Sequence, residues 1–203
     1  MEVVLKPEDF INLGLVAPNC KIEKLNIAIN EALDFDLCYA FEKCHIEVKQ
    51  LIKKVLLYNP ESEEPAPTEY EIKLVNGVVF TENDKTFENL GLKRGLIYYA
   101  YSRYLLINEF NDTATGQKTQ NFQFSVPKTY QELKSMSDKY RNMAKAAMLS
   151  TYEYIAKNRN EFPQLVRCLN LSDCYCGRDN YDSPCSINTT GYQLKSRNIK
   201  KRY

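Results

Sequence analysis

Histidine is almost absent from this sequence, in which His45 is the only one. It directly follows Cys44 in an amphipathic segment, and adjacent helical residues point roughly 100° apart, so this pair cannot act as base and nucleophile. The chain also lacks G-x-S-x-G, Walker and G-x-G-x-x-G motifs. We therefore expect no enzymatic activity and no cofactor, and we interpret His45 as a half-buried helix residue.

Long apolar runs and a strong net charge are missing as well. No apolar stretch of about eighteen residues is free of charge, so we expect no membrane span. Residues 1–6 lack the features of a signal peptide, which predicts a protein that stays in the cytoplasm of the cell that makes it, with seven reduced cysteines. A formal net charge of +1 does not suit a protein that coats nucleic acid.

Helical patterns dominate what is present. Residues 96–108 are apolar or aromatic on nearly every face, which predicts a central helix surrounded by other elements. Tyr98, Tyr99, Tyr101 and Tyr104 surround it, so at least two should pack inward while others could present hydroxyls to a partner. Thr129 followed by Glu132 is a capping box that predicts a second long helix, ending near Asn160.

The N-terminal half predicts further helix. Pro7, two acids and Gly14 indicate a short capped helix. Residues 22–57 contain neither Gly nor Pro, and they predict either one long helix or two helices broken near residues 34–36. The apolar positions of this stretch fall three and four residues apart on one stripe: Leu33, Leu37, Phe41, Cys44, Val48, Leu51, Ile52 and Val55.

One hairpin and two irregular segments complete the predicted fold. Asn76-Gly77 between β-branched runs predicts a two-stranded hairpin at residues 70–81. Residues 111–127 form a polar inter-helix arm, and Pro163 should end helical structure. We therefore expect a mainly α helical bundle, divided into a short helix and turn at 1–20, a helical core at 21–165 and a largely irregular tail at 166–203.

The tail contains Cys168, Cys174, Cys176 and Cys185, with five, one and eight residues between them. Four thiols are enough for a zinc site, but the C-x2-C knuckle is missing; reduced thiols and a disulfide formed after release from the cell are the alternatives. The basic end, residues 195–202, is either solvated or contacts nucleic acid or an acidic groove. A small zinc- or DNA-binding regulator is therefore the alternative function.

Several short motifs occur in one order at a familiar spacing. They are Asn76-Gly77, Gly91-Leu92-Lys93, Tyr99-Ala100-Tyr101, Arg103-Tyr104, residues 113–116, Val126-Pro127, Tyr140-Arg141 with Ala144, and Phe162-Pro163, with Ile29, Glu31-Ala32 and Leu51 upstream. Residues 22–165 thereby resemble the head-tail connector, or adaptor, ring proteins of tailed double-stranded DNA bacteriophages, particularly those of crAss-like phages.

The resemblance implies a virion protein, made in the host bacterial cytoplasm, that forms a ring of about twelve copies in the phage neck. Its implied partners are other copies of itself, the portal protein, further neck or tail rings, and genomic DNA that passes through the channel without sequence-specific binding. The tail after Pro163 is longer than the family core requires. On this basis we expect the arm and the basic end to contact partners, through Thr113, Thr115, Gly116, Phe122, Phe124, Pro127, Lys195, Arg197, Lys200, Lys201 and Arg202.

Overall fold

The computed structural model describes residues 4–17, 20–61, 63, 65–82, 84–113, 116–119 and 129–169. The N-terminal elements are α1 (Pro7–Ile11), α2 (Ile22–Glu31), the π-helix η1 (Ala32–Asp36), α3 (Leu37–Phe41), the 3-10 turn η2 (Glu42–Cys44), α4 (His45–Leu56) and α5 (Glu69–Asn76). They are followed by β1 (Val78–Glu82), β2 (Lys85–Asn89), α6 (Leu92–Glu109), β3 (Phe110–Thr113), β4 (Gly116–Thr119), α7 (Tyr130–Lys157) and α8 (Pro163–Cys168). The prediction of a mainly helical fold with a small antiparallel hairpin is confirmed.

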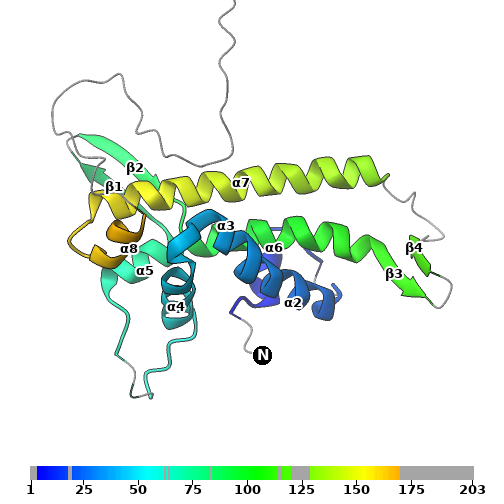
Figure 1. Ribbon diagram of the computed structural model, residues 1–203, viewed down its shortest axis with the longest axis horizontal. Helices are drawn as coiled ribbons and strands as arrows, with labels where there is room; N and C mark the ends of the chain where they lie inside the picture. Colours follow the sequence, from blue (N-terminus) through cyan, green and yellow to red (C-terminus); the bar gives the residue numbers. More distant parts are fainter. Residues whose placement is uncertain are drawn as a thin grey trace, which may run out of the picture.

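Helices α6 and α7 form the central pair and run side by side in opposite directions (Figure 1). Helix α6 also contacts α1, α2, α5 and η1, and it buries Leu92, Leu96 and Ala100 completely. The prediction of a surrounded central helix is therefore confirmed. Close approach is possible because Gly95 faces α7, where a Cβ on this residue would lie 2.4 Å from Met148 Cε.

Helix α7 begins where the capping box predicts. The Thr129 hydroxyl accepts a hydrogen bond from the Glu132 backbone N–H at 3.3 Å, and the Glu132 carboxylate accepts one from the Thr129 N–H at 2.8 Å. These two bonds satisfy donors that the first turn would otherwise leave unpaired. The helix ends at Lys157, close to the predicted end.

The segment 22–57 is a bent series of helices, so it is not one long helix, and its turn falls later in the chain than the break expected near residues 34–36. Residues 34–36 lie within the π-helix η1, through which the chain continues from α2 into α3. The sharp turn falls at Glu42, whose φ is +43°. Tertiary contacts hold this turn, because the Tyr152 hydroxyl donates to the Ala40 carbonyl and the Tyr152 ring lies 5.0 Å from that of Phe41.

The predicted hairpin at residues 70–81 is wrong in position. Residues 69–76 form helix α5, which a second capping box between Thr68 and Glu71 initiates and whose Leu74 and Val75 are buried. Gly77, at φ +92°, stops this helix instead of turning a hairpin. The hairpin is the β1–β2 ribbon, in which Val78 pairs with Asn89 and Glu82 with Lys85.

Both ends of the described chain pack on the same core. Leu5 and Phe10 near the N-terminus are fully buried, and the Asp9 carboxylate lies 2.6 Å from Lys93 on α6. The expectation that Pro163 ends helical structure is wrong, because proline at the first helical position starts α8. Helix α8 packs on the core cluster through its buried side chains Leu165 and Val166. The last described residue is Leu169, just beyond this helix.

Candidate interaction surfaces

Of the interface residues expected from the sequence, the structure describes only two, Thr113 and Gly116. They pair across the end of the β3–β4 ribbon, which forms the first part of the arm and projects beyond the α6–α7 pair (Figure 1). This ribbon replaces part of what the sequence predicted to be an irregular polar arm. The other expected residues lie outside the described residues: Thr115, Phe122, Phe124, Pro127, Lys195, Arg197, Lys200, Lys201 and Arg202.

Most of the tyrosines of α6 pack in the core, as expected for at least two of them, and are not available to a partner. Tyr99, Tyr101 and Tyr104 are buried, and Tyr98 is half-buried. Burial and the nearby Asp36 carboxylate raise the pKa of Tyr99 to about 12, because both disfavour a phenolate. The Tyr101 ring meets the Tyr140 ring of α7 edge to face, with 4.7 Å between the centroids.

A cluster of charges joins the π-helix to the central pair. Asp36 is 8% exposed and accepts hydrogen bonds from the Arg103 guanidinium of α6, which also donates to Glu31 at 2.9 Å. Arg141 of α7 lies 3.9 Å from the same Asp36 carboxylate. A buried carboxylate needs such partners, so this cluster holds η1 against α6 and α7. Sequence reasoning missed it, because its members lie far apart in the chain.

Large apolar side chains also lie on the outside of the α2–η1–α3 run. Ile27, Phe35 and Tyr39 are 50%, 63% and 66% exposed, and we call these three residues the outer stripe. Their spacings of eight and four residues place them on the side opposite the buried Leu33 and Leu37. The Arg103 guanidinium lies over the Phe35 ring, 5.7 Å from its centre, in a cation–π contact. The helical spacing of these exposed residues was the sequence signal that could have revealed the stripe.

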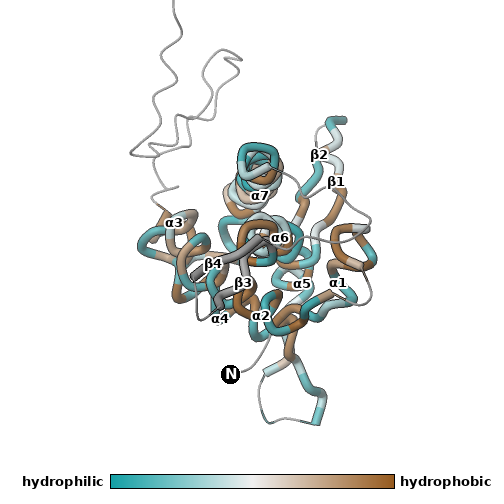
Figure 2. Tube along the Cα trace, turned by 90° about the vertical axis from the view of Figure 1, so that its right-hand side faces the viewer, coloured by the Kyte–Doolittle hydropathy of each residue, from teal (hydrophilic) through white to brown (hydrophobic). Residues whose placement is uncertain are grey.

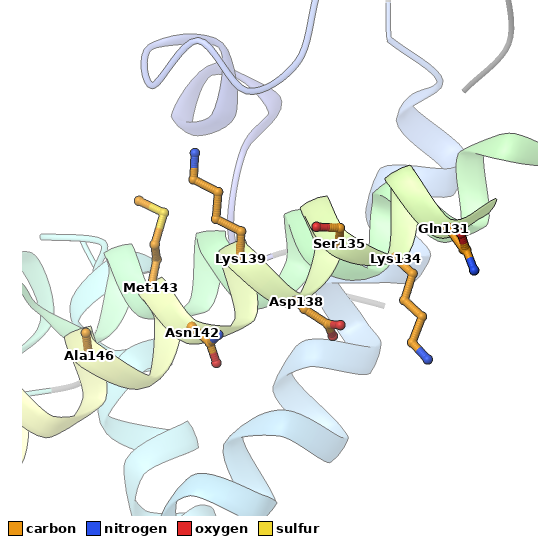
Figure 3. Close-up of a pocket in the computed structure, with 8 residues that line it drawn as sticks. All are labelled: Gln131, Lys134, Ser135, Asp138, Lys139, Asn142, Met143 and Ala146. Atoms are coloured by element: carbon orange, nitrogen blue, oxygen red, sulfur yellow. The ribbon is translucent and has the colours of Figure 1, made fainter. Parts of the chain in front are cut away.

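A shallow open groove of about 870 Å³ follows the outer side of α7 (Figure 3). Its described lining comes from successive turns of this one helix, and we call it the α7 groove: Gln131, Lys134, Ser135, Asp138, Lys139, Asn142, Met143 and Ala146. The lining combines two lysines, one aspartate, two amides and one hydroxyl with the apolar Met143 and Ala146. An extended surface of this kind suits a protein segment better than an enclosed small molecule.

The state of two cysteines corrects the expectation of reduced thiols. Cys44 in η2 and Cys168 at the end of α8 form a disulfide, whereas Cys20 and Cys38 are free. Cys174, Cys176 and Cys185 lie outside the described residues. His45 is the first residue of α4 and half-buried, and its Nδ1 lies 2.7 Å from the Glu42 carbonyl. It therefore helps to close the turn at which α3 and α4 meet.

Two further observations concern the described part of the chain alone. There, no set of three or more His, Cys, Asp or Glu side chains is placed to hold a metal ion. Each helix there is too short or too polar to cross a membrane.

The fold and these surfaces define a mainly helical protein with a central antiparallel helix pair, a two-stranded ribbon near each end of that pair and an exposed aromatic stripe. The chain belongs to DUF6712, a family of unknown function, whose family model matches residues 48–173. No curated protein and no solved structure matches the chain.

Proposed function

We propose that this protein is a structural subunit of the neck of a tailed double-stranded DNA bacteriophage, where its copies form a closed ring between the portal and the tail. The motifs that resemble the connector proteins support this proposal, and several of them lie at joints of the fold. Gly77 and Gly91 lie where the β1–β2 ribbon leaves the helices, Arg103 and Arg141 flank the buried Asp36, and Pro163 starts α8.

The observation that carries the proposal is the pair of ribbons near opposite ends of the α6–α7 pair (Figure 1). A ring subunit must contact one neighbour through one surface and the other neighbour through a different surface. Projections at two separate places on a rigid helical body meet this requirement. The net charge of +1 also suits a channel wall, because DNA must slide past it without being held by many Lys or Arg contacts to phosphate.

Quantitative mass spectrometry of purified phage particles tests the proposal. The chain is counted against the major capsid protein, and a non-virion protein of the same phage serves as the control for contamination. We expect about a dozen copies per particle, or a small multiple of that number. Absence from the particles would reject the connector function and direct attention to zinc and DNA binding by the C-terminal segment.

A further inference from the structure

We propose that the outer stripe of one copy docks into the α7 groove of the next copy, so that these two surfaces form a repeating contact of the ring beside the contacts made by the ribbons. This inference rests on the proposed function and adds a second, separately testable part to its subunit contact. The occupant of the groove is thus a second copy of this chain, presented through Phe35 and Tyr39.

The stripe has the composition of a binding surface. Aromatic residues and arginine are enriched where interfaces concentrate their binding energy. Phe35 and Tyr39 are both more than 60% exposed in the single chain, although each carries a large apolar ring. Phe35 rests on Arg103, which two carboxylates already hold in place, so little side-chain freedom remains to be lost on binding.

The groove offers matching groups. Met143 and Ala146 provide an apolar floor, and a methionine sulfur packs favourably against aromatic rings. Lys134 and Lys139 both line the groove (Figure 3), and neither has an ion-pair partner among the described residues. Lys139 lies one helical turn from Met143, whereas Lys134 lies nearer the start of α7 and points to the other edge of the groove (Figure 3).

The charges of the two surfaces are complementary. Residues 22–44, which carry the stripe, contain five acidic and two basic residues, a net charge of −3. The lining of the α7 groove contains two lysines and one aspartate, a net charge of +1. Glu31 and Asp34 beside the stripe pair with Arg103 and Lys49 within the chain, but their side chains remain 38% and 44% exposed, so they can also approach the groove lysines of a neighbour.

The positions of the two surfaces favour a head-to-tail contact. The stripe belongs to α2, η1 and α3, whereas the groove belongs to α7, so the two share no residue. Seen along the central pair, α3 lies to one side of α7, and α1 and the β1–β2 ribbon lie to the other (Figure 2). When a contact joins two different surfaces, every open oligomer has one unoccupied stripe at one end and one unoccupied groove at the other. All stripes and grooves are occupied only when the ring closes.

Mixing two full-length variants tests this contact. The stripe variant carries Phe35→Ser and Tyr39→Ser, and the groove variant carries Lys139→Glu and Met143→Glu. The control is Ile46→Ser, because Ile46 on α4 is also largely exposed, at 56%, and belongs to neither surface nor to either ribbon. Circular dichroism and thermal melting first establish that each variant is folded, and sedimentation velocity then measures its assembly alone and in a 1:1 mixture.

We expect wild type and the control to form rings, and each double variant alone to stay monomeric, with self-association weakened about tenfold or more. The 1:1 mixture should form dimers and nothing larger, because it contains one intact stripe and one intact groove. Rings formed by either double variant, or a mixture that stays monomeric, would overturn the contact and leave the connector function standing. A monomeric wild-type protein that is also absent from phage particles would overturn both.

Discussion

At the scale of single residues, the Cys44–Cys168 bond joins positions that are 124 residues apart in the sequence and 5.7 Å apart between Cα atoms. It fastens α8 to the turn between α3 and α4. A crosslink over so long a loop restricts the unfolded chain strongly, which in the chain-entropy description is worth up to about 5 kcal/mol.

We therefore predict that Cys168→Ser lowers the free energy of unfolding by about 2 to 5 kcal/mol under oxidising conditions and has little effect in the presence of a reductant. Urea unfolding with and without dithiothreitol measures both values. Cys38→Ser, which replaces a free and half-buried thiol, is the matched control and should behave as wild type in both buffers. Equal stability of oxidised and reduced wild type would contradict the prediction.

Tyr99 leads to a prediction about pH. Its pKa in the folded protein is raised to about 12, above the ordinary value of 10, because burial and Asp36 disfavour the phenolate. The folded state therefore holds the phenol proton more tightly than the unfolded chain does. This contribution to stability is fully present below pH 10 and is lost as the pH rises from 10 towards 12.

We expect the free energy of unfolding of wild type to fall above pH 10, and Tyr99→Phe to make that fall shallower. Part of the fall should remain, because burial also raises the pKa of Tyr101, Tyr104, Tyr152 and Tyr154. Urea titrations between pH 8 and about 11 measure the slope. Tyr58→Phe, at an exposed position, provides the comparison, and equal slopes for the two variants would refute the assignment.

At the scale of elements, Gly77 and Gly91 form the joint from which the β1–β2 ribbon leaves the helical body. Both have positive φ, and a Cβ at Gly91 would lie 2.5 Å from the Gly77 nitrogen and 2.6 Å from the Val75 carbonyl oxygen. Asn89 ties the joint together, since its amide donates to the Lys73 carbonyl and its side-chain oxygen accepts from the Gly91 N–H. Helices α5 and α6 and the ribbon thus meet through close backbone contacts at this joint. A shift of one element would disturb its contacts with the other two.

Gly91→Ala should therefore destabilise the protein by about 3 kcal/mol or more, because both the dihedral angle and the backbone contacts oppose a methyl group. Gly14→Ala is the matched control, since Gly14 also has positive φ but a Cβ there would meet no atom within 4 Å. Its expected cost is about 1 to 2 kcal/mol. Thermal unfolding compares the two variants, and equal losses would show that the joint is less crowded than the structure indicates.

At the scale of the whole molecule, the arm is the segment whose removal tests assembly. We predict that replacing residues 111–127 by a glycine-serine linker of equal length leaves a folded monomer that no longer joins rings, because the core cluster formed by the described residues already extends from Val4 to α8. Circular dichroism measures folding and sedimentation velocity measures assembly. A length-matched replacement of residues 59–67, the proline-rich connector between α4 and α5, is the control and should still assemble. Loss of folding in the arm variant would show that the arm belongs to the core.

Sequence alone determined the features that depend on near neighbours in the chain. The capping box at Thr129 predicted the start of α7, because a side chain and the N–H three residues away form the bond locally. Residues 96–108 predicted a central helix. The apolar positions from Leu33 to Val55 predicted the inward face of segment 22–57, and all of them are buried or half-buried, because helical period and hydrophobicity together specify which side avoids water.

Tertiary structure alone decided the features that need distant partners. Asn76-Gly77 is compatible with a hairpin turn and with a helix stop; the local capping box of Thr68 and Glu71 favours the helix, and the burial of Leu74 and Val75 against the core secures it. The turn at Glu42 depends on Tyr152 and on the bond to Cys168, more than 100 residues away. The contact between Asp36 and Arg103 likewise joins residues 67 positions apart, and it turns one side of η1 toward α6 while Phe35 and Tyr39 stay exposed.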